Sequence, residues 1–459
     1  MRGIVFVPGI SGSELIYHGA EDTGPIWPPK PEDLYVYQEL DELLDPKRVT
    51  VGIVIDSVLG EGVYQTTEND LRSISNSING GANGPYLPVP YDWRIDLLSS
   101  VDTLATKIAA FANTPGMTEI TVVAHSMGGL LTRLLLEWKY ANAALPAWFG
   151  KVTRALFICT RHLGAPTALA RLLGLEVTET VIQPDQMQKF AADSNFPAVY
   201  QLLPPPARGI LFDTVNNTFI PYNDPRAIAA LGLSNPNLQA AQKLSAALNP
   251  AKKPASVKYS FVYGTGHPTD ERVNVAGLTL NGAKPWQDDQ GDGTVPSWSI
   301  AAAATQFTPH IPPQSFPGDH VGILLTDAFR QFLYSYFGVA GPAPLVSDAP
   351  GVVVSLNKHS FAPGETIHAL LVPDEAAHAI SGSLSLSRVT PADAAPSAMG
   401  VRQDVSFRGG PVRSLPSTLT APTTAGLYRL DFGGDGASHK TSDQVAGWFF
   451  VPGTPPAGS

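Results

Sequence analysis

Residues 120–129 read Ile-Thr-Val-Val-Ala-His-Ser-Met-Gly-Gly, and this stretch decides the fold. Its first five residues are β-branched or small and apolar, which predicts a buried strand of a parallel sheet. The Leu-rich segment 128–138 predicts a helix directly after it. Ser126 therefore lies on a tight strand-to-helix turn, flanked by small residues, with its hydroxyl above the sheet at a helix N-terminus. The pattern G-x-S-x-G is met with Ala124 at its first position, and an ordinary serine in a βα turn is the alternative.

Composition limits the classes of function. The chain has 459 residues, enough for two or three domains and a sizeable core. Only 15% of the residues are charged and the net charge is −10, which argues against a nucleic-acid partner and against electrostatic attraction to anionic membranes. Cys159 is the only cysteine, so no intrachain disulfide can form. We expect no transmembrane helix, because no apolar run reaches about 18 residues. We recognise no targeting segment in residues 1–7, so the expected location is cytoplasmic, with the compartment left open.

The order of predicted elements indicates an α/β fold. Short apolar runs predict strands at residues 3–7, 86–92, 120–124, 152–159 and 258–263. Helical spacing of apolar residues over 97–111 separates two of these strands, as in a sheet with helices on both faces. We expect this core to span residues 1–163 and 255–340. The Ala/Leu/Pro-rich segment 164–254 shows no convincing strand and predicts a helical cap.

The last hundred residues have a different pattern. Residues 341–350 are rich in Gly, Pro and Ala, which predicts a linker. Beyond it, alternation such as Ser-Leu-Ser-Leu-Ser at 383–387 predicts an all-β sandwich over residues 351–452, followed by a tail at 453–459. Its ligand is unknown, and a passive structural role is the simpler interpretation.

A serine nucleophile needs a base and a group that orients the base. The candidate bases in the α/β part are His162, His267, His310 and His320. We favour His320, because it follows a short strand-like segment and precedes the last predicted helix. His310 lies among prolines, and His125 is expected to pack beneath the serine turn, pointing away from Ser126.

The orienting acid should lie between the serine and the histidine in the chain. Asp292 does so, within Gly-Asp-Gly-Thr-Val-Pro, where two glycines allow a tight turn. Asp288 and Asp289 are rivals that fit a solvated acidic turn or weak calcium binding better. One acidic cluster is not a metal site, so we predict neither a metal nor another cofactor.

An oxyanion intermediate needs two backbone N–H donors. The residue after the nucleophile, Met127, would supply one. Ile10 would supply the other, because Gly9 and Gly12 free the backbone of the loop that follows the first strand. A plain glycine turn is the alternative for this loop.

Four segments resemble the lecithin:cholesterol acyltransferase family in sequence and in order: Val-Pro-Gly-Ile-Ser-Gly-Ser at 7–13, Tyr-Asp-Trp-Arg at 91–94, Ala-His-Ser-Met-Gly-Gly at 124–129 and Gly-Asp-Gly-Thr-Val at 291–295. The resemblance covers about residues 1–340. It implies an α/β-hydrolase fold with a triad of Ser126, Asp292 and His320, and it places Ile10 and Met127 at the oxyanion. It further implies that Trp27 belongs to a mobile lid near the acyl site.

Together these features predict a serine-dependent acyl-ester hydrolase or acyltransferase of lipid esters: a lipase, phospholipase or O-acyltransferase that works through an acyl-enzyme on Ser126. Peripheral membrane contact is left open. The alternatives are an esterase of small non-lipid esters and a non-catalytic binding or adhesion protein built on a hydrolase fold.

Overall fold

The computed structural model describes residues 1–20, 22–30, 33, 37–58, 61–81, 83–175, 182–341, 351–390, 393–434 and 447–451. Its largest sheet has six strands, all paired in parallel. In spatial order they are β15 (Gln314–Pro317), β12 (Lys258–Thr265), β9 (Val152–Ile158), β8 (Glu119–His125), β1 (Arg2–Val7) and β7 (Tyr86–Pro88).

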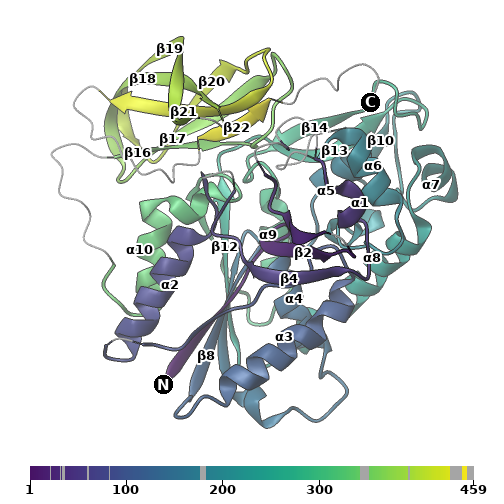
Figure 1. The fold of residues 1–459 in the computed structure, drawn as a ribbon, viewed down its shortest axis with the longest axis vertical. Coiled ribbons are helices and arrows are strands. Elements are labelled where there is room, and N and C mark those ends of the chain that lie inside the picture. The colour runs from purple at the N-terminus through teal and green to yellow at the C-terminus, as the bar shows by residue number, and fades with distance from the viewer. Residues whose placement is uncertain are drawn as a thin grey trace.

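In the inner strands β12, β9, β8 and β1, residues on the two faces serve two separate cores. In β1, Ile4 and Phe6 pack with helices α2 (Gln65–Ile78) and α10 (Asp327–Tyr336). Val5 and Val7 face the opposite core, which includes α3 (Leu97–Ala112) and α4 (Met127–Arg133). Figure 1 shows the two helix layers on either side of the strands. Both faces of the sheet are therefore buried, which explains the nearly continuous apolar runs in its strands.

The region after β9 is mainly helical, but the expectation that it holds no strand was wrong. Its α-helices are α5 (Thr167–Leu172), α6 (Pro184–Ala192), α7 (Pro225–Leu231) and α8 (Asn235–Ala247). Between α6 and α7 lie β10 (Leu211–Asp213) and β11 (Thr218–Ile220), which share a sheet with β13 (Thr269–Val275) and β14 (Lys284–Asp289). Strands of three residues are too short to show a period, and β10 finds its partner β13 only in the folded chain.

A small antiparallel sheet is formed by residues near the start of the chain. It consists of β2 (Ser13–His18), β3 (Thr23–Trp27) and β4 (Val49–Val54), with α1 (Leu40–Leu43) and the hairpin of β5 (Ser57–Val58) and β6 (Glu61–Gly62) nearby in sequence. Arg94 forms an ion pair with Asp92 at 2.7 Å and donates to the carbonyl oxygens of Leu43 and Asp45. This buried guanidinium therefore ties the loop after β7 to the loop after α1.

Two antiparallel sheets form the C-terminal sandwich. One holds β16 (Val352–Leu356), β17 (Thr366–Pro373) and β20 (Leu415–Thr420); the other holds β19 (Asp393–Val412), β18 (Ala377–Thr390), β21 (Gly426–Gly434) and β22 (Trp448–Val451). Their facing side chains, including Leu356, Leu384 and Phe449, make a core of their own. The predicted tail, and the predicted linker from residue 342 on, lie outside the described residues.

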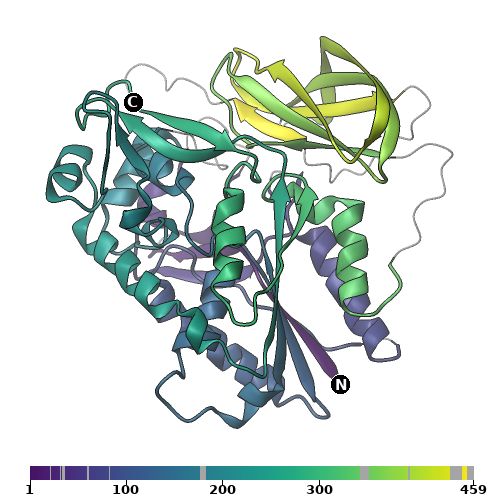
Figure 2. The same cartoon turned by 180° about the vertical axis from the view of Figure 1, so that it is seen from behind.

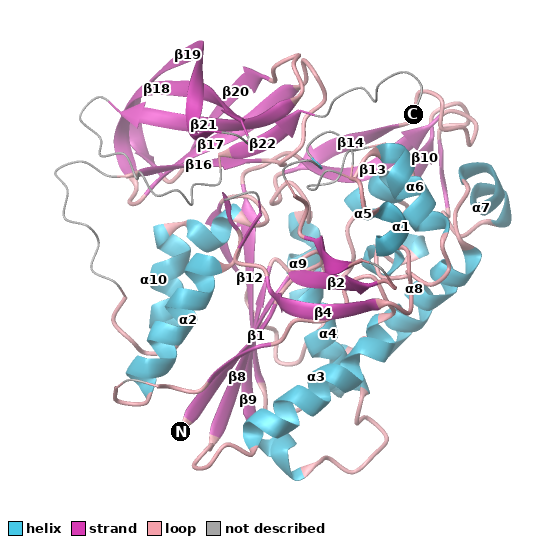
Figure 3. Ribbon diagram, viewed as in Figure 1, coloured by secondary structure: helices cyan, strands magenta, loops and turns pink. Residues whose placement is uncertain are grey.

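The C-terminal sandwich lies beyond the end of the six-stranded sheet that is opposite the N-terminus (Figures 1 and 2). Because the parallel strands all begin near the N-terminus, the sandwich faces their carboxyl ends. Figure 3 shows this antiparallel unit above the mixed α/β unit. Within the described part of the chain, no helix has the length and apolar character needed to cross a membrane.

Candidate active site

Ser126 occupies a sharp turn between β8 and α4. Its backbone has φ 51° and ψ −123°, a conformation that residues other than glycine avoid and that costs about 1–3 kcal/mol. The turn packs tightly against the end of β1, because a Cβ atom on Gly128 would lie 2.3 Å from the carbonyl oxygen of Pro8. Glycine is therefore required two residues after Ser126, and the strained turn is held by this close packing.

Three residues far apart in sequence are joined by hydrogen bonds. The Nε2 atom of His320 lies 2.8 Å from the Ser126 hydroxyl, and its Nδ1 atom lies 2.8 Å from Oδ2 of Asp292. The other carboxylate oxygen of Asp292 accepts from the N–H groups of Thr294 and Val295 at 2.9 and 2.6 Å. All three side chains are buried. This arrangement can remove the hydroxyl proton and stabilise the resulting imidazolium.

The two backbone N–H groups expected at an oxyanion lie beside this serine. Met127 is the first residue of α4, and Ile10 follows Gly9, whose added Cβ would come 2.9 Å from the Ser126 Cβ. Among the described residues, neither N–H group has a hydrogen-bond acceptor. Both donors are therefore available to a ligand.

A relay that the sequence did not reveal connects the two loops around Ser126. The Tyr64 hydroxyl accepts from the N–H of Gly9 at 2.9 Å and lies 2.7 Å from Nδ1 of His125. Nε2 of His125 lies 2.9 Å from the carbonyl oxygen of His320, so it carries a proton and donates there. His125 thus supports the His320 loop as well as packing behind the turn. Tyr64 belongs to no motif, so only its position identifies it.

The competing histidines occupy other places. His162 is buried, and burial together with Arg133 lowers its pKa well below the usual value. His267 contacts Ser355 of the C-terminal sandwich, with Nε2 2.8 Å from the serine hydroxyl. His310 is exposed. The side chains of Asp288 and Asp289 lie outside the described part of the structure.

One cluster has the composition of a metal site. The ligand atoms of His125, Cys159 and His320 lie within 4.8 Å of one another. The nitrogens of both imidazoles already take part in the hydrogen bonds above. Burial, with Asp292 nearby, raises the pKa of the Cys159 thiol well above its usual value, so the thiol holds its proton. This donor set therefore fits the hydrogen-bonded arrangement better than a metal ion.

Ser126 lines a partly open cavity whose exposed surface is mainly apolar. Its lining includes Ile10, Tyr64 and Leu325 from the α/β unit, and His359 and Trp448 from the C-terminal sandwich. A second cavity, also mostly apolar, shares Ile10, Ser11 and Arg161 with the first. Two adjoining cavities with mainly apolar walls suit an apolar ligand.

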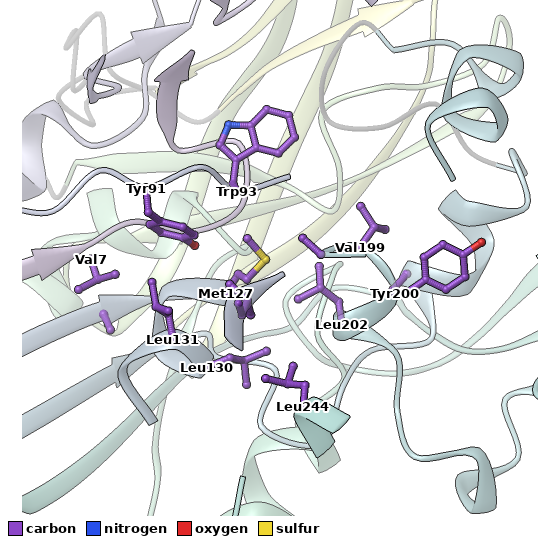
Figure 4. Packing of buried hydrophobic residues seen from close by; sticks show 14 of the residues in the cluster. Val7, Tyr91, Trp93, Met127, Leu130, Leu131, Val199, Tyr200, Leu202 and Leu244 are labelled. Carbon is purple, nitrogen blue, oxygen red and sulfur yellow. The ribbon is translucent and has the colours of Figure 1, made fainter. Parts of the chain in front are cut away.

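Trp27 and Arg161 form parts of the cavity walls, and Met127 packs close to them. Trp27 lines the first cavity, is 1% exposed, and donates from Nε1 to the carbonyl oxygen of Ser11 at 2.8 Å. Figure 4 shows the Met127 side chain in the same buried cluster as Tyr91, Val199 and Leu202, and the last two of these also line the second cavity. No role was predicted for Arg161, which is buried and lines both cavities.

Comparison with known proteins gives one family match. The family model described as "Lecithin:cholesterol acyltransferase" matches residues 77–230, a range that includes Ser126 but neither Asp292 nor His320. No curated protein matches the sequence.

Among solved structures, a chain of the Tle4–Tli4 complex matches with 14% sequence identity and a TM-score of 0.48, over 70% of this chain and 92% of that chain. Phospholipase PlaB from Legionella pneumophila matches with 12% identity and a TM-score of 0.31, over 94% of this chain and 86% of that chain. Siderophore hydrolase EstB from Aspergillus fumigatus also matches, with 12% identity and a TM-score of 0.25, over 73% of this chain and 88% of that chain. All three TM-scores are below 0.5. The family match confirms what the sequence motifs indicated: over residues 77–230, this chain resembles the lecithin:cholesterol acyltransferase family.

Proposed function

We propose that this chain is a serine ester hydrolase or O-acyltransferase of lipid esters. The observation that carries the proposal is the hydrogen-bonded series Ser126–His320–Asp292, open to an apolar cavity. The family match supports lipid esters as the substrate class. The pair of adjoining cavities supports the same class, because their linings are mainly apolar and would bury apolar surface of a ligand.

The reaction follows from the positions of the atoms. The Ser126 oxygen attacks the ester carbonyl while Nε2 of His320 takes its proton, and the N–H groups of Ile10 and Met127 bind the negative oxygen that forms. The tetrahedral intermediate expels the alcohol, which receives the proton from His320, and an acyl-enzyme remains. Water or a second alcohol then attacks the acyl carbonyl carbon while Nε2 of His320 takes its proton, and the bond to the Ser126 oxygen breaks as that oxygen receives the proton from His320.

The test uses the purified chain, a fluorophosphonate probe and p-nitrophenyl butyrate. The wild-type protein should be labelled covalently and should hydrolyse the ester. The Ser126→Ala variant should do neither, although its melting temperature should equal that of the wild type. Ser100→Ala is the matched control, because Ser100 is a buried serine of α3 that lines neither cavity. Turnover by Ser126→Ala at the wild-type rate would refute the proposal, and an inert wild type would favour a non-catalytic binding protein.

Substrate class is tested separately. Phosphatidylcholine vesicles, with and without a long-chain alcohol, should yield free fatty acid and a new ester if lipid esters are the substrates. Activity confined to short soluble esters would instead assign the chain as an esterase of small molecules. The ratio of ester to acid formed would separate transferase from hydrolase, since it reports how far the site excludes water during deacylation.

A further inference from the structure

Residues of the C-terminal sandwich contact both loops that carry the base and the acid. A Cβ on Gly293, next to Asp292, would lie 1.9 Å from the carbonyl oxygen of Asn357, so the two backbones touch. On the other loop, Asp319 immediately precedes His320 and contacts Ser355 and His359. The sandwich therefore contacts the two loops that place Asp292 and His320 relative to Ser126.

Ser355, at the centre of this contact, is 0% exposed and uses its whole hydrogen-bonding capacity. Its hydroxyl donates to Oδ2 of Asp319 at 2.6 Å and accepts from the N–H of Asp319 at 2.8 Å. Nε2 of His267 lies 2.8 Å from the same oxygen, and since the hydroxyl proton is already given to Asp319, this nitrogen must donate. One hydroxyl thus joins Asp319 to His267, whose backbone pairs with Asp292 and whose N–H donates to the carbonyl oxygen of Gly291 at 3.0 Å.

Asp319 in turn fixes the backbone of the His320 loop. Its Oδ1 atom accepts from the N–H groups of Val321 and Gly322 at 3.0 and 2.7 Å, on the far side of His320. Burial by itself would raise the pKa of this carboxyl, but the hydrogen bond and charge of His359, with His267 and Ser355, outweigh it and hold the pKa well below the usual range. A buried carboxylate of this kind needs all of its donors.

We propose that Ser355 and Asp319 are positioning residues for His320, so that the C-terminal sandwich is a working part of the active site. This inference rests on the proposed function. Ser355 anchors Asp319, Asp319 holds the turn on both sides of His320, and the imidazole thereby stays within 2.8 Å of the serine hydroxyl. His359 and Trp448 of the same sandwich form one wall of the substrate cavity. The sandwich thus both orients the base and encloses the substrate.

The test measures the turnover of p-nitrophenyl butyrate per active site, and the number of active sites is counted in a separate sample titrated to completion with a fluorophosphonate. Ser355→Ala should lower kcat per titrated site at least about 10-fold with KM unchanged, because small displacements of a base cost up to about 100-fold. Ser360→Ala is the matched control: this serine is also buried in the sandwich, and its hydroxyl has no hydrogen-bond partner among the described residues. It should turn over at the wild-type rate.

A second variant guards against misfolding. Asp319→Asn keeps the side-chain shape but removes the charge, and it should lower kcat per titrated site at least as much as Ser355→Ala. If either variant lost titratable sites but kept the wild-type kcat per remaining site, the network would be merely structural and the inference would be overturned. Wild-type kcat in both variants would overturn it too, while leaving the proposed function intact. An inactive wild type would instead remove the proposed function, and this inference with it.

Discussion

Replacing Asp292 by asparagine tests the site most sharply, because the substitution changes one hydrogen bond and keeps the rest. The backbone N–H groups of Thr294 and Val295 can still bind the amide oxygen in place of Oδ1. The amide nitrogen then faces Nδ1 of His320, where the carboxylate oxygen lay 2.8 Å away. Two N–H donors cannot face each other, so the imidazole must place its proton on Nε2, the nitrogen that should accept from Ser126.

The expected loss is large. A histidine held in the wrong tautomer costs about 10⁴-fold in kcat, which corresponds to about 5 kcal/mol of transition-state stabilisation. The fold should survive, since the loop keeps both backbone hydrogen bonds to residue 292 and the side-chain volume does not change.

The assay is the steady-state rate of p-nitrophenyl butyrate hydrolysis, with near-UV circular dichroism to check the fold. Asp213→Asn is the matched control, because Asp213 is also buried and also accepts backbone N–H bonds, from Val215 and Gly277, but lines neither cavity. The control should retain wild-type activity. A folded Asp292→Asn enzyme within about tenfold of the wild-type kcat would show that Asp292 does not orient the base, and the reasoning would fail.

Three further expectations concern the surrounding structure. Gly293→Ala should lower the free energy of unfolding, measured by urea titration, by about 1–3 kcal/mol more than Gly364→Ala does. Both glycines have positive φ (83° and 78°), but only a side chain at 293 would meet another backbone, so equal losses would contradict the contact. Tyr64→Phe should lower kcat about tenfold with little change in KM, since the relay to His125 is cut; an unchanged kcat would count against it. Burial lowers the pKa of His267 from 6.5 to about 4, so the unfolded chain binds the extra proton and unfolding free energy should fall by up to ~3 kcal/mol between pH 6.5 and pH 4; His267→Gln should flatten this slope, and an equally steep slope in the variant would exclude His267 as its source.

The C-terminal sandwich shows how a local pattern differs from an assembled site. Alternation over residues 383–387 predicted its strands, and β18 spans them. The pattern carries no information on docking, so a passive role was the simpler interpretation. In the structure, Trp448 and His359 enter the cavity of Ser126, and Ser355 bonds to the residue before His320. Contacts between units depend on the shapes of two folded surfaces, which no short stretch of sequence encodes.

The sequence by itself determined the parallel α/β core and the turn at Ser126, because both are written in neighbouring residues: apolar runs bury strands, and small residues permit a sharp turn. It also narrowed the partners of Ser126 to a few histidines and aspartates by their order along the chain. Only the tertiary structure decided that Asp292 and His320 meet the serine, that Tyr64 and His125 connect their loops, and that β10 pairs with β13. These contacts depend on distances in the folded chain, where short hydrogen bonds and strand pairings join residues that are far apart in sequence.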